Sequence, residues 1–161
     1  MKKVSIEIKI NKGEILNELT RRSSYTALAV VPAQQGEGGD NGVVDKIVLS
    51  SDDYPWCGDK FRMLFFKLRD ILKPFSSCGE DFADDRETEV CFKLTLGANT
   101  QDTVVHYMKE IMINYLLAQW FLERMYDKSE YLSSQCDNMI TLLRMTLNRT
   151  LMDTRRPTNY L

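Results

Sequence analysis

The sequence predicts a mainly α domain of the α+β type, with a long C-terminal antiparallel helical hairpin, two N-terminal helices and two or three short strands. Two long runs of apolar residues at helical spacing, separated by a few polar residues, follow residue 99 and predict the hairpin. Alternation of apolar and polar residues at 4–10 predicts a strand. The 161 residues, 43% hydrophobic and 27% charged, are typical of one globular domain over 1–161.

The N-terminal strand at 4–10 has isoleucine or valine on one side and polar residues on the other, so one of its faces should be exposed to solvent. A helix over 13–28 should follow, and the Ser23–Ser24 pair is a point at which it could break early. Its apolar residues at roughly helical spacing are Ile15, Leu16, Leu19, Tyr25, Ala27 and Leu28.

A stretch without large apolar side chains, PAQQGEGGDNG, predicts a flexible loop over 33–43. Its glycines raise the question of a phosphate-binding loop, but the last of them is followed by two valines instead of the Lys and hydroxyl residue of a P-loop. The dinucleotide fingerprint also fails, because no third Gly is in register after Gly36 and Gly38. We therefore predict a linker, or a loop that a partner orders.

The next two elements are a strand over about 43–50 and a helix over about 58–73. VVDKIVLS is rich in β-branched residues and is followed by the turn-forming residues of SDDYP. Pro74 should end the helix. The buried stripe of this helix consists of Phe61, Leu64, Phe65, Leu68, Ile71 and Leu72.

Acidic residues dominate the sequence SSCGEDFADDRETE, which predicts a polar, solvated connector over 76–89. A calcium loop is disfavoured, because neither the Gly of its sharp turn nor its closing Glu is in register. The sequence TEVCFKLTL then alternates and predicts either a third strand or an extended arm packed on the core.

The hairpin begins with a helix over about 102–126, capped by Asn99 or Thr100. Apolar residues cover more than half of its circumference, so we expect it to be the central helix of the fold. Asp127 and Glu130 resemble a capping box at the start of the second helix. The buried stripe of that second helix consists of Leu132, Cys136, Met139, Leu143 and Leu147.

No pattern in the sequence indicates catalysis, a cofactor or a metal site. The four cysteines form no C-x-x-C pair and are accompanied by one histidine, so we expect reduced thiols in a cytoplasmic protein and no zinc site. His106 has no recognisable acid or nucleophile partner and should be a packed or surface side chain. The sequence contains neither G-x-S-x-G nor H-E-x-x-H, and we predict a protein that is not an enzyme.

Charge and hydropathy disfavour two classes of partner. A net charge of −2 argues against a general nucleic-acid coat. The most apolar run, IMINYLLAQWFL, is shorter than the roughly 20 residues that span a bilayer, so no membrane contact is expected. Methionines are abundant in the last two predicted helices, where they either fill the core or form a groove for a partner.

Positive charge gathers at the end of the sequence. A basic tail over 153–161 follows the last helix, and its arginines suit carboxylate or phosphate groups of a partner. Two alternatives remain open: the arginines compensate the helix dipole, and the tail is a frayed end. The predicted partner-binding residues are Arg144, Arg149, Arg155, Arg156 and Tyr160.

The order of these parts resembles small proteins from the virion-structural gene blocks of tailed bacteriophages and prophages, especially of Bacteroides-like hosts. The segments that carry the resemblance are VSIEIKI, DKIVLSSDD before a helix ending LKPF, VHYMKEIMINYLLAQWFLE, and ITLLRMTLNRTLMDTRRP. Proteins of this group act at the neck of the virion as head-tail connector or head-completion proteins.

The resemblance implies a protein made in the bacterial cytoplasm and then built into the virion, as a ring of identical copies between portal and tail. Its partners would be further copies of itself, the portal and tail proteins and, non-specifically, the passing DNA. Ring contacts are heterologous, so each copy must offer two different surfaces. The candidates in the sequence are the Arg-rich end and the acidic segment 80–89.

Two other functions fit the same sequence. One is a tail-completion or tail-terminator protein, which is a neighbouring role in the virion. The other is a non-viral helical protein-binding module that uses the Met-rich hairpin as a groove.

Overall fold

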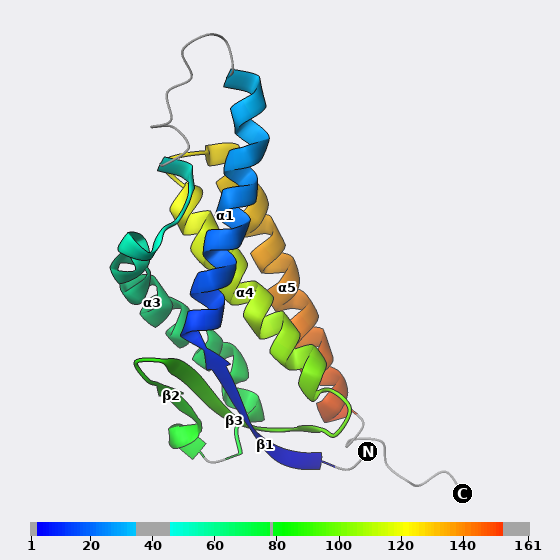
Figure 1. Ribbon diagram of the computed structural model, residues 1–161. Coiled ribbons are helices and arrows are strands. Elements are labelled where there is room, and N and C mark those ends of the chain that lie inside the picture. Colours follow the sequence, from blue (N-terminus) through cyan, green and yellow to red (C-terminus); the bar gives the residue numbers. More distant parts are fainter. Residues whose placement is uncertain (1–2, 35–45, 78, 153–161) are drawn as a thin grey trace, which may run out of the picture.

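The computed structural model describes residues 3–34, 46–77 and 79–152, and within them it confirms the mainly α fold. Four long helices are described: α1 (Lys12–Gln34), α3 (Tyr54–Leu72), α4 (Gln101–Phe121) and α5 (Tyr126–Met152). Short 3-10 helices cover Ser51–Asp53, Lys73–Phe75 and Gly79–Phe82. The C-terminal helices α4 and α5 pack along each other as the predicted antiparallel hairpin (Figure 1).

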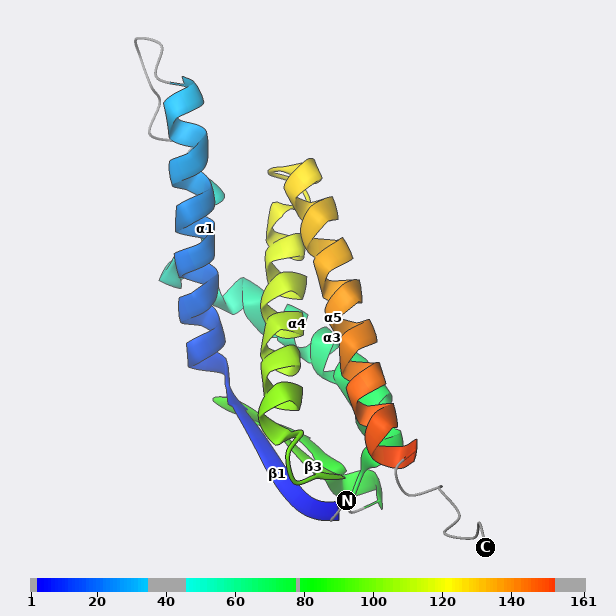
Figure 2. The same ribbon diagram turned by 90° about the vertical axis from the view of Figure 1, so that its right-hand side faces the viewer.

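A small antiparallel sheet lies at one end of the helices (Figures 1 and 2). Its strands are β1 (Lys3–Asn11), β2 (Ala83–Asp85) and β3 (Glu89–Gly97), in the order β1-β3-β2. The register pairs Ile8 with Phe92, and both side chains are buried. The alternation that predicted β1 and β3 therefore places one face of the sheet on the core, as expected for antiparallel strands.

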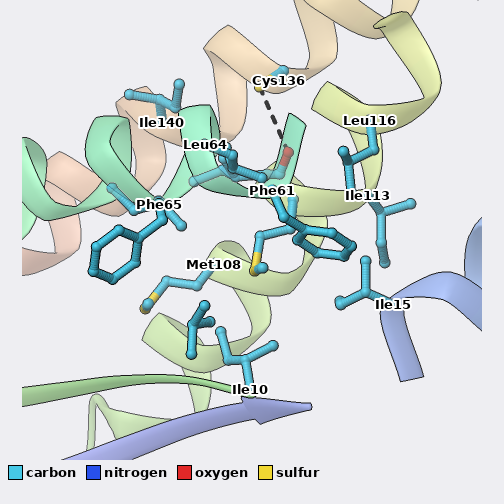
Figure 3. Close-up of a cluster of buried hydrophobic side chains, with 14 of the residues drawn as sticks. Ile10, Ile15, Phe61, Leu64, Phe65, Met108, Ile113, Leu116, Cys136 and Ile140 are labelled. Atoms are coloured by element: carbon cyan, nitrogen blue, oxygen red, sulfur yellow. Dashed lines mark hydrogen bonds between the residues drawn. The ribbon is translucent and has the colours of Figure 1, made fainter. Parts of the chain in front are cut away.

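Helix α4 is the centre of the fold, because α1, α3 and α5 all pack against it. Its apolar residues point in every direction around the axis, which is typical of a helix that is covered on all sides. Figure 3 shows side chains from α3, such as Phe61 and Leu64, meeting Met108 and Leu116 of α4. The predicted role of this segment as the central helix is confirmed.

Two hydrogen bonds from α5 to carbonyl groups of α4 fix the hairpin in addition to its apolar contacts. The buried Ser129 hydroxyl donates to the Ala118 carbonyl at 2.8 Å. The Cys136 thiol donates to the Ile111 carbonyl, with an S···O distance of 3.7 Å, the dashed line in Figure 3.

Strand β1 passes directly into helix α1. Asn11 ends the strand, and its side-chain Oδ1 accepts hydrogen bonds from the backbone N–H groups of Gly13 at 2.7 Å and Glu14 at 3.3 Å. These bonds cap the helix, since its first N–H groups have no partner within it. The Lys12 ammonium lies 2.7 Å from Asp85 Oδ1 in β2, so the junction is also tied to the far edge of the sheet.

The predicted strand over 43–50 is wrong for its described part, 46–50, which forms no strand. Side chains satisfy its backbone in place of a strand partner. Leu49 N–H donates to Ser23 Oγ at 2.9 Å, and Trp120 Nε1 donates to the Ile47 carbonyl at 2.8 Å. Arg124 donates to the Lys46 carbonyl at 2.9 Å and stacks on Trp120, with its guanidinium carbon 3.6 Å from the ring centroid.

Helix α1 is longer than predicted, because it continues past Ser23–Ser24 to Gln34. Both hydroxyls bond the Thr20 carbonyl within the helix, so they do not break it. The first two residues of the predicted loop 33–43 belong to α1, and 35–43 lie outside the described residues.

The segment 76–89 is more ordered than the predicted solvated connector. It contains a 3-10 helix and strand β2, which pairs with β3. Phe82, 2% exposed, anchors this acidic segment to the core, and its burial explains why the segment adopts regular structure.

The start of α5 also differs from the prediction. Because α5 begins at Tyr126, Asp127 lies within its first turn, where an acid stabilises the helix dipole, and Asp127 is not the cap residue. Of the two predicted caps of α4, Asn99 and Thr100, the structure has Thr100. Its hydroxyl donates to the Gly97 carbonyl and accepts no hydrogen bond from the helix.

Replacing Trp120 by Phe should lower the free energy of unfolding by about 1–3 kcal/mol, because the Ile47 carbonyl loses its buried donor. Urea denaturation followed by circular dichroism measures the change. Trp56→Phe is the matched control: Trp56 is half-buried, and its indole N–H makes none of the hydrogen bonds found among the described residues. An equal loss in both variants would contradict the anchoring role of Trp120.

Candidate protein-binding groove

A groove of about 390 Å³ opens between α1 and α5, with α4 as its floor. Figure 2 looks at this side of the molecule, where α1 diverges from the hairpin along its length. We call this the α1–α5 groove. It is lined by Arg22, Tyr25 and Thr26 of α1, by Asn114, Leu117 and Phe121 of α4, and by Lys128, Tyr131, Leu132 and Gln135 of α5.

Asn114 is the polar group in the floor of the groove. It is 6% exposed and lies in the otherwise apolar middle of α4. No hydrogen bond found among the described residues uses its carboxamide. The carboxamide N and O atoms are not among the fully buried atoms without a partner, so they face the opening of the groove. Asn114 is therefore suited to an occupant that supplies a donor and an acceptor.

Arg22 closes one side of the groove and holds α1 on α4. Its guanidinium donates to both carboxylate oxygens of Glu110, at 3.1 and 2.8 Å, and its Nε donates to Glu18 at 2.8 Å. The bidentate hydrogen bond to Glu110 raises the pKa of Arg22, against the opposing effect of burial.

The hydrogen bond from Arg21 lowers the pKa of Glu18 to about 2, against the opposing effect of burial, and Arg22 adds to this lowering. Arg22 is therefore ion-paired with the carboxylates of both Glu18 and Glu110.

Two tyrosines stand at the rim of the groove. Tyr25 is 60% exposed and Tyr131 is 57% exposed, although tyrosine rings carry a large apolar surface. A cation lies near each ring: Arg21 at 5.8 Å from the centroid of Tyr25, and Lys128 at 5.5 Å from that of Tyr131. Tyrosine and arginine are both enriched at protein interfaces.

The predicted partner-binding arginines do not meet at the groove. Arg144 and Arg149 are exposed on α5, and neither forms an ion pair within the part of the chain that the structure describes. Arg149 lies in the last turn of α5, where a cation suits the helix dipole. Arg155, Arg156 and Tyr160 lie outside the described residues, so their predicted role stays a prediction.

The methionines of the hairpin mainly fill the core. Met108 and Met112 of α4 are buried, and Met139 of α5 is partly buried against them, whereas Met145 is 53% exposed. His106 is on the surface, with its ring 5.8 Å from that of Tyr107. These positions agree with the packing interpretation of the methionines and with a surface histidine.

The described cysteines are buried free thiols. Burial raises the pKa of Cys57 and of Cys136 to about 11, so both remain protonated at neutral pH. Within residues 3–34, 46–77 and 79–152, no group of three or more His, Cys, Asp or Glu side chains could hold a metal ion. None of the described helices is long and apolar enough to span a bilayer.

The sequence contained signals for this groove that the periodicity argument missed. Tyr25 and Leu28 were counted among the apolar residues at roughly helical spacing that predicted the first helix, but they are 60% and 64% exposed. Asn114 is a polar residue within the apolar run IMINYLL, and this interruption is the clearest sequence signal of the site.

Three comparisons with known proteins add no relative. No protein-family model, no curated protein and no solved structure matches this chain. The function must therefore be argued from the geometry of the groove and from the surfaces around it.

Glu18→Gln should destabilise the protein by on the order of 1 kcal/mol at about pH 6. The pKa of Glu18 is lowered in the folded state, so its contribution is present above about pH 4.5 and is lost as the pH falls towards 2. Urea denaturation at several pH values measures the difference from wild type. Glu123→Gln, which removes an exposed carboxylate without a described ion pair, is the control. A Glu18→Gln effect that grows as the pH falls would contradict this assignment.

Proposed function

We propose that this chain is a non-enzymatic assembly protein whose work is to bind other protein chains, with the α1–α5 groove as one of its interfaces. The observation that supports this best is the unpartnered, buried Asn114 beneath a rim of exposed tyrosines. A concave site with an apolar floor and a few placed polar groups is the usual form of a binding site. Tyrosine-rich rims are common where the bound group is a protein.

Within this class, the head-tail connector of a tailed phage is the assembly that we propose, on the strength of the sequence resemblance. A connector ring needs two different surfaces on every copy, since its contacts are heterologous. The groove is one candidate surface. A second is an exposed apolar pair one turn apart on α3, Met63 at 57% and Phe66 at 50% exposure.

The two surfaces belong to different sides of the central helix. The groove lies between α1 and α5, whereas α3 passes behind the hairpin in Figure 2. Surfaces on different sides of a subunit allow it to contact two neighbours at once, which supports a ring more than a closed dimer.

A photo-crosslinking amino acid at Tyr131 should form covalent adducts with another protein chain when the full chain is expressed in cells that make it naturally. The exposed ring stands at the groove rim, so the substitution should leave the fold intact. The same amino acid at Asp137, which is exposed on the side of α5 opposite the groove residues, is the control. Mass spectrometry should identify the crosslinked protein as a further copy, a portal protein or a tail protein. Equal labelling at both positions, or no adduct at Tyr131, would remove the groove as an interface.

Phe66→Ser should weaken self-association, because the exposed ring would be buried between neighbouring copies of the ring. Sedimentation velocity over a range of protein concentrations measures this, and Asp137→Ser, at an exposed position on α5, is the control. We expect at least about a tenfold shift in the dissociation constant for Phe66→Ser. A wild-type chain that stays monomeric at every concentration would count against the ring.

A further inference from the structure

The shape of the groove limits what can enter it. Its floor runs along α4 from Asn114 to Phe121, a length of about 10 Å at 1.5 Å per residue. Extended chain advances about 3.3 Å per residue, so about three residues of a strand-like segment fit along the floor. A helix with its side chains is about 10–12 Å wide and would cover the groove without entering it.

The residues of the groove floor can contact both an apolar side chain and the backbone of a bound segment. Leu117, Phe121 and Leu132 are 2%, 0% and 6% exposed and form the apolar part. The Asn114 carboxamide offers one acceptor and two donors, which match the N–H and C=O groups of one residue in an extended segment. Gln135 in the α5 wall offers a second carboxamide of the same kind.

The charges in the groove favour a carboxylate. Arg22 is already paired with Glu18 and Glu110, and Arg21 also pairs with Glu18, so these two cations and two carboxylates carry no net charge. Lys128 is different, because it is half-buried, lies against Tyr131 and has no carboxylate partner within the described part of the chain. An occupant with an acidic side chain at that point would complete an ion pair that is shielded from water on one side.

We infer that the α1–α5 groove binds a short extended segment of a partner protein that carries an apolar side chain next to an Asp or Glu. The apolar side chain lies on Leu117 and Phe121, the segment's backbone pairs with Asn114, and the carboxylate reaches Lys128. This inference rests on the proposed function, because it specifies what the protein-binding interface recognises.

The test uses a displayed library of random heptapeptides, selected on the full wild-type chain and counter-selected on Asn114→Leu. Leucine replaces the unpartnered carboxamide by an apolar side chain of similar size, so the fold should be retained; circular dichroism checks this. The selected peptides should pair Phe, Leu or Trp with Asp or Glu within two positions. Labelled copies of these peptides then give affinities by fluorescence anisotropy.

Lys128→Glu should weaken binding of the acidic peptides by at least about tenfold and should favour the same peptides with Lys in place of the acid. Thr141→Glu, which adds a negative charge at an exposed position about 20 Å further along α5, should leave the affinity within about twofold of wild type. In wild-type protein, the side-chain amide resonances of Asn114 should shift on titration with the peptide.

Two results would overturn the inference: a library that yields no peptide dependent on Asn114, and selected peptides whose affinity is unchanged in Lys128→Glu. Neither result would affect the proposed function if Tyr131 still crosslinks to another protein. Conversely, peptide binding without any crosslinked protein in cells would preserve the recognition chemistry and contradict the role in assembly.

Discussion

The burial of most of α4 is the constraint on which the rest of the structure depends. A helix that is apolar around its whole circumference is stable only when neighbours cover every side, and α1, α3 and α5 do so here. The sheet closes one end, because Ile10 of β1 and Phe92 of β3 belong to the same core. The position of each peripheral element is therefore set by the part of α4 that it covers.

The groove follows from the place where this covering is incomplete. Arg22 holds α1 to α4 through Glu110, and beyond this contact α1 diverges, so that Tyr25 and Leu28 are exposed. On the other side, Ser129 and Cys136 hold α5 close to α4 by hydrogen bonds to its carbonyl groups. The α5 wall of the groove is thus held to α4 by these hydrogen bonds, whereas the α1 wall is held to α4 by the ion pair of Arg22 and Glu110. Asn114 lies at this base, where a polar side chain can be buried and still face an opening.

Periodicity in the sequence was sufficient to predict α3, α4, α5, β1 and β3, because their apolar spacing directly reflects which face is buried. It failed where tertiary contacts outside the segment decide the structure. VVDKIVLS has the composition of a strand, but Trp120, Arg124 and Ser23 satisfy the backbone of its described part without one. The acidic segment 76–89 is ordered by the single buried ring of Phe82. The groove depends on the divergence of α1 from the hairpin, which no local sequence pattern encodes. Among the residues that line the groove, Asn114 gave the clearest signal in the sequence.

The junction of β1 and α1 has a mechanical consequence. No loop separates strand β1 from helix α1, and the contacts of Asn11 and Lys12 fix the angle between them. The direction of α1 therefore depends on the orientation of the sheet. Tyr25 lies 13 residues beyond Lys12, or about 20 Å along the helix axis, so a tilt of about 3° at the corner displaces the ring by about 1 Å. The geometry of this corner therefore sets the direction in which α1 leaves the sheet, and with it the position of the α1 wall of the groove.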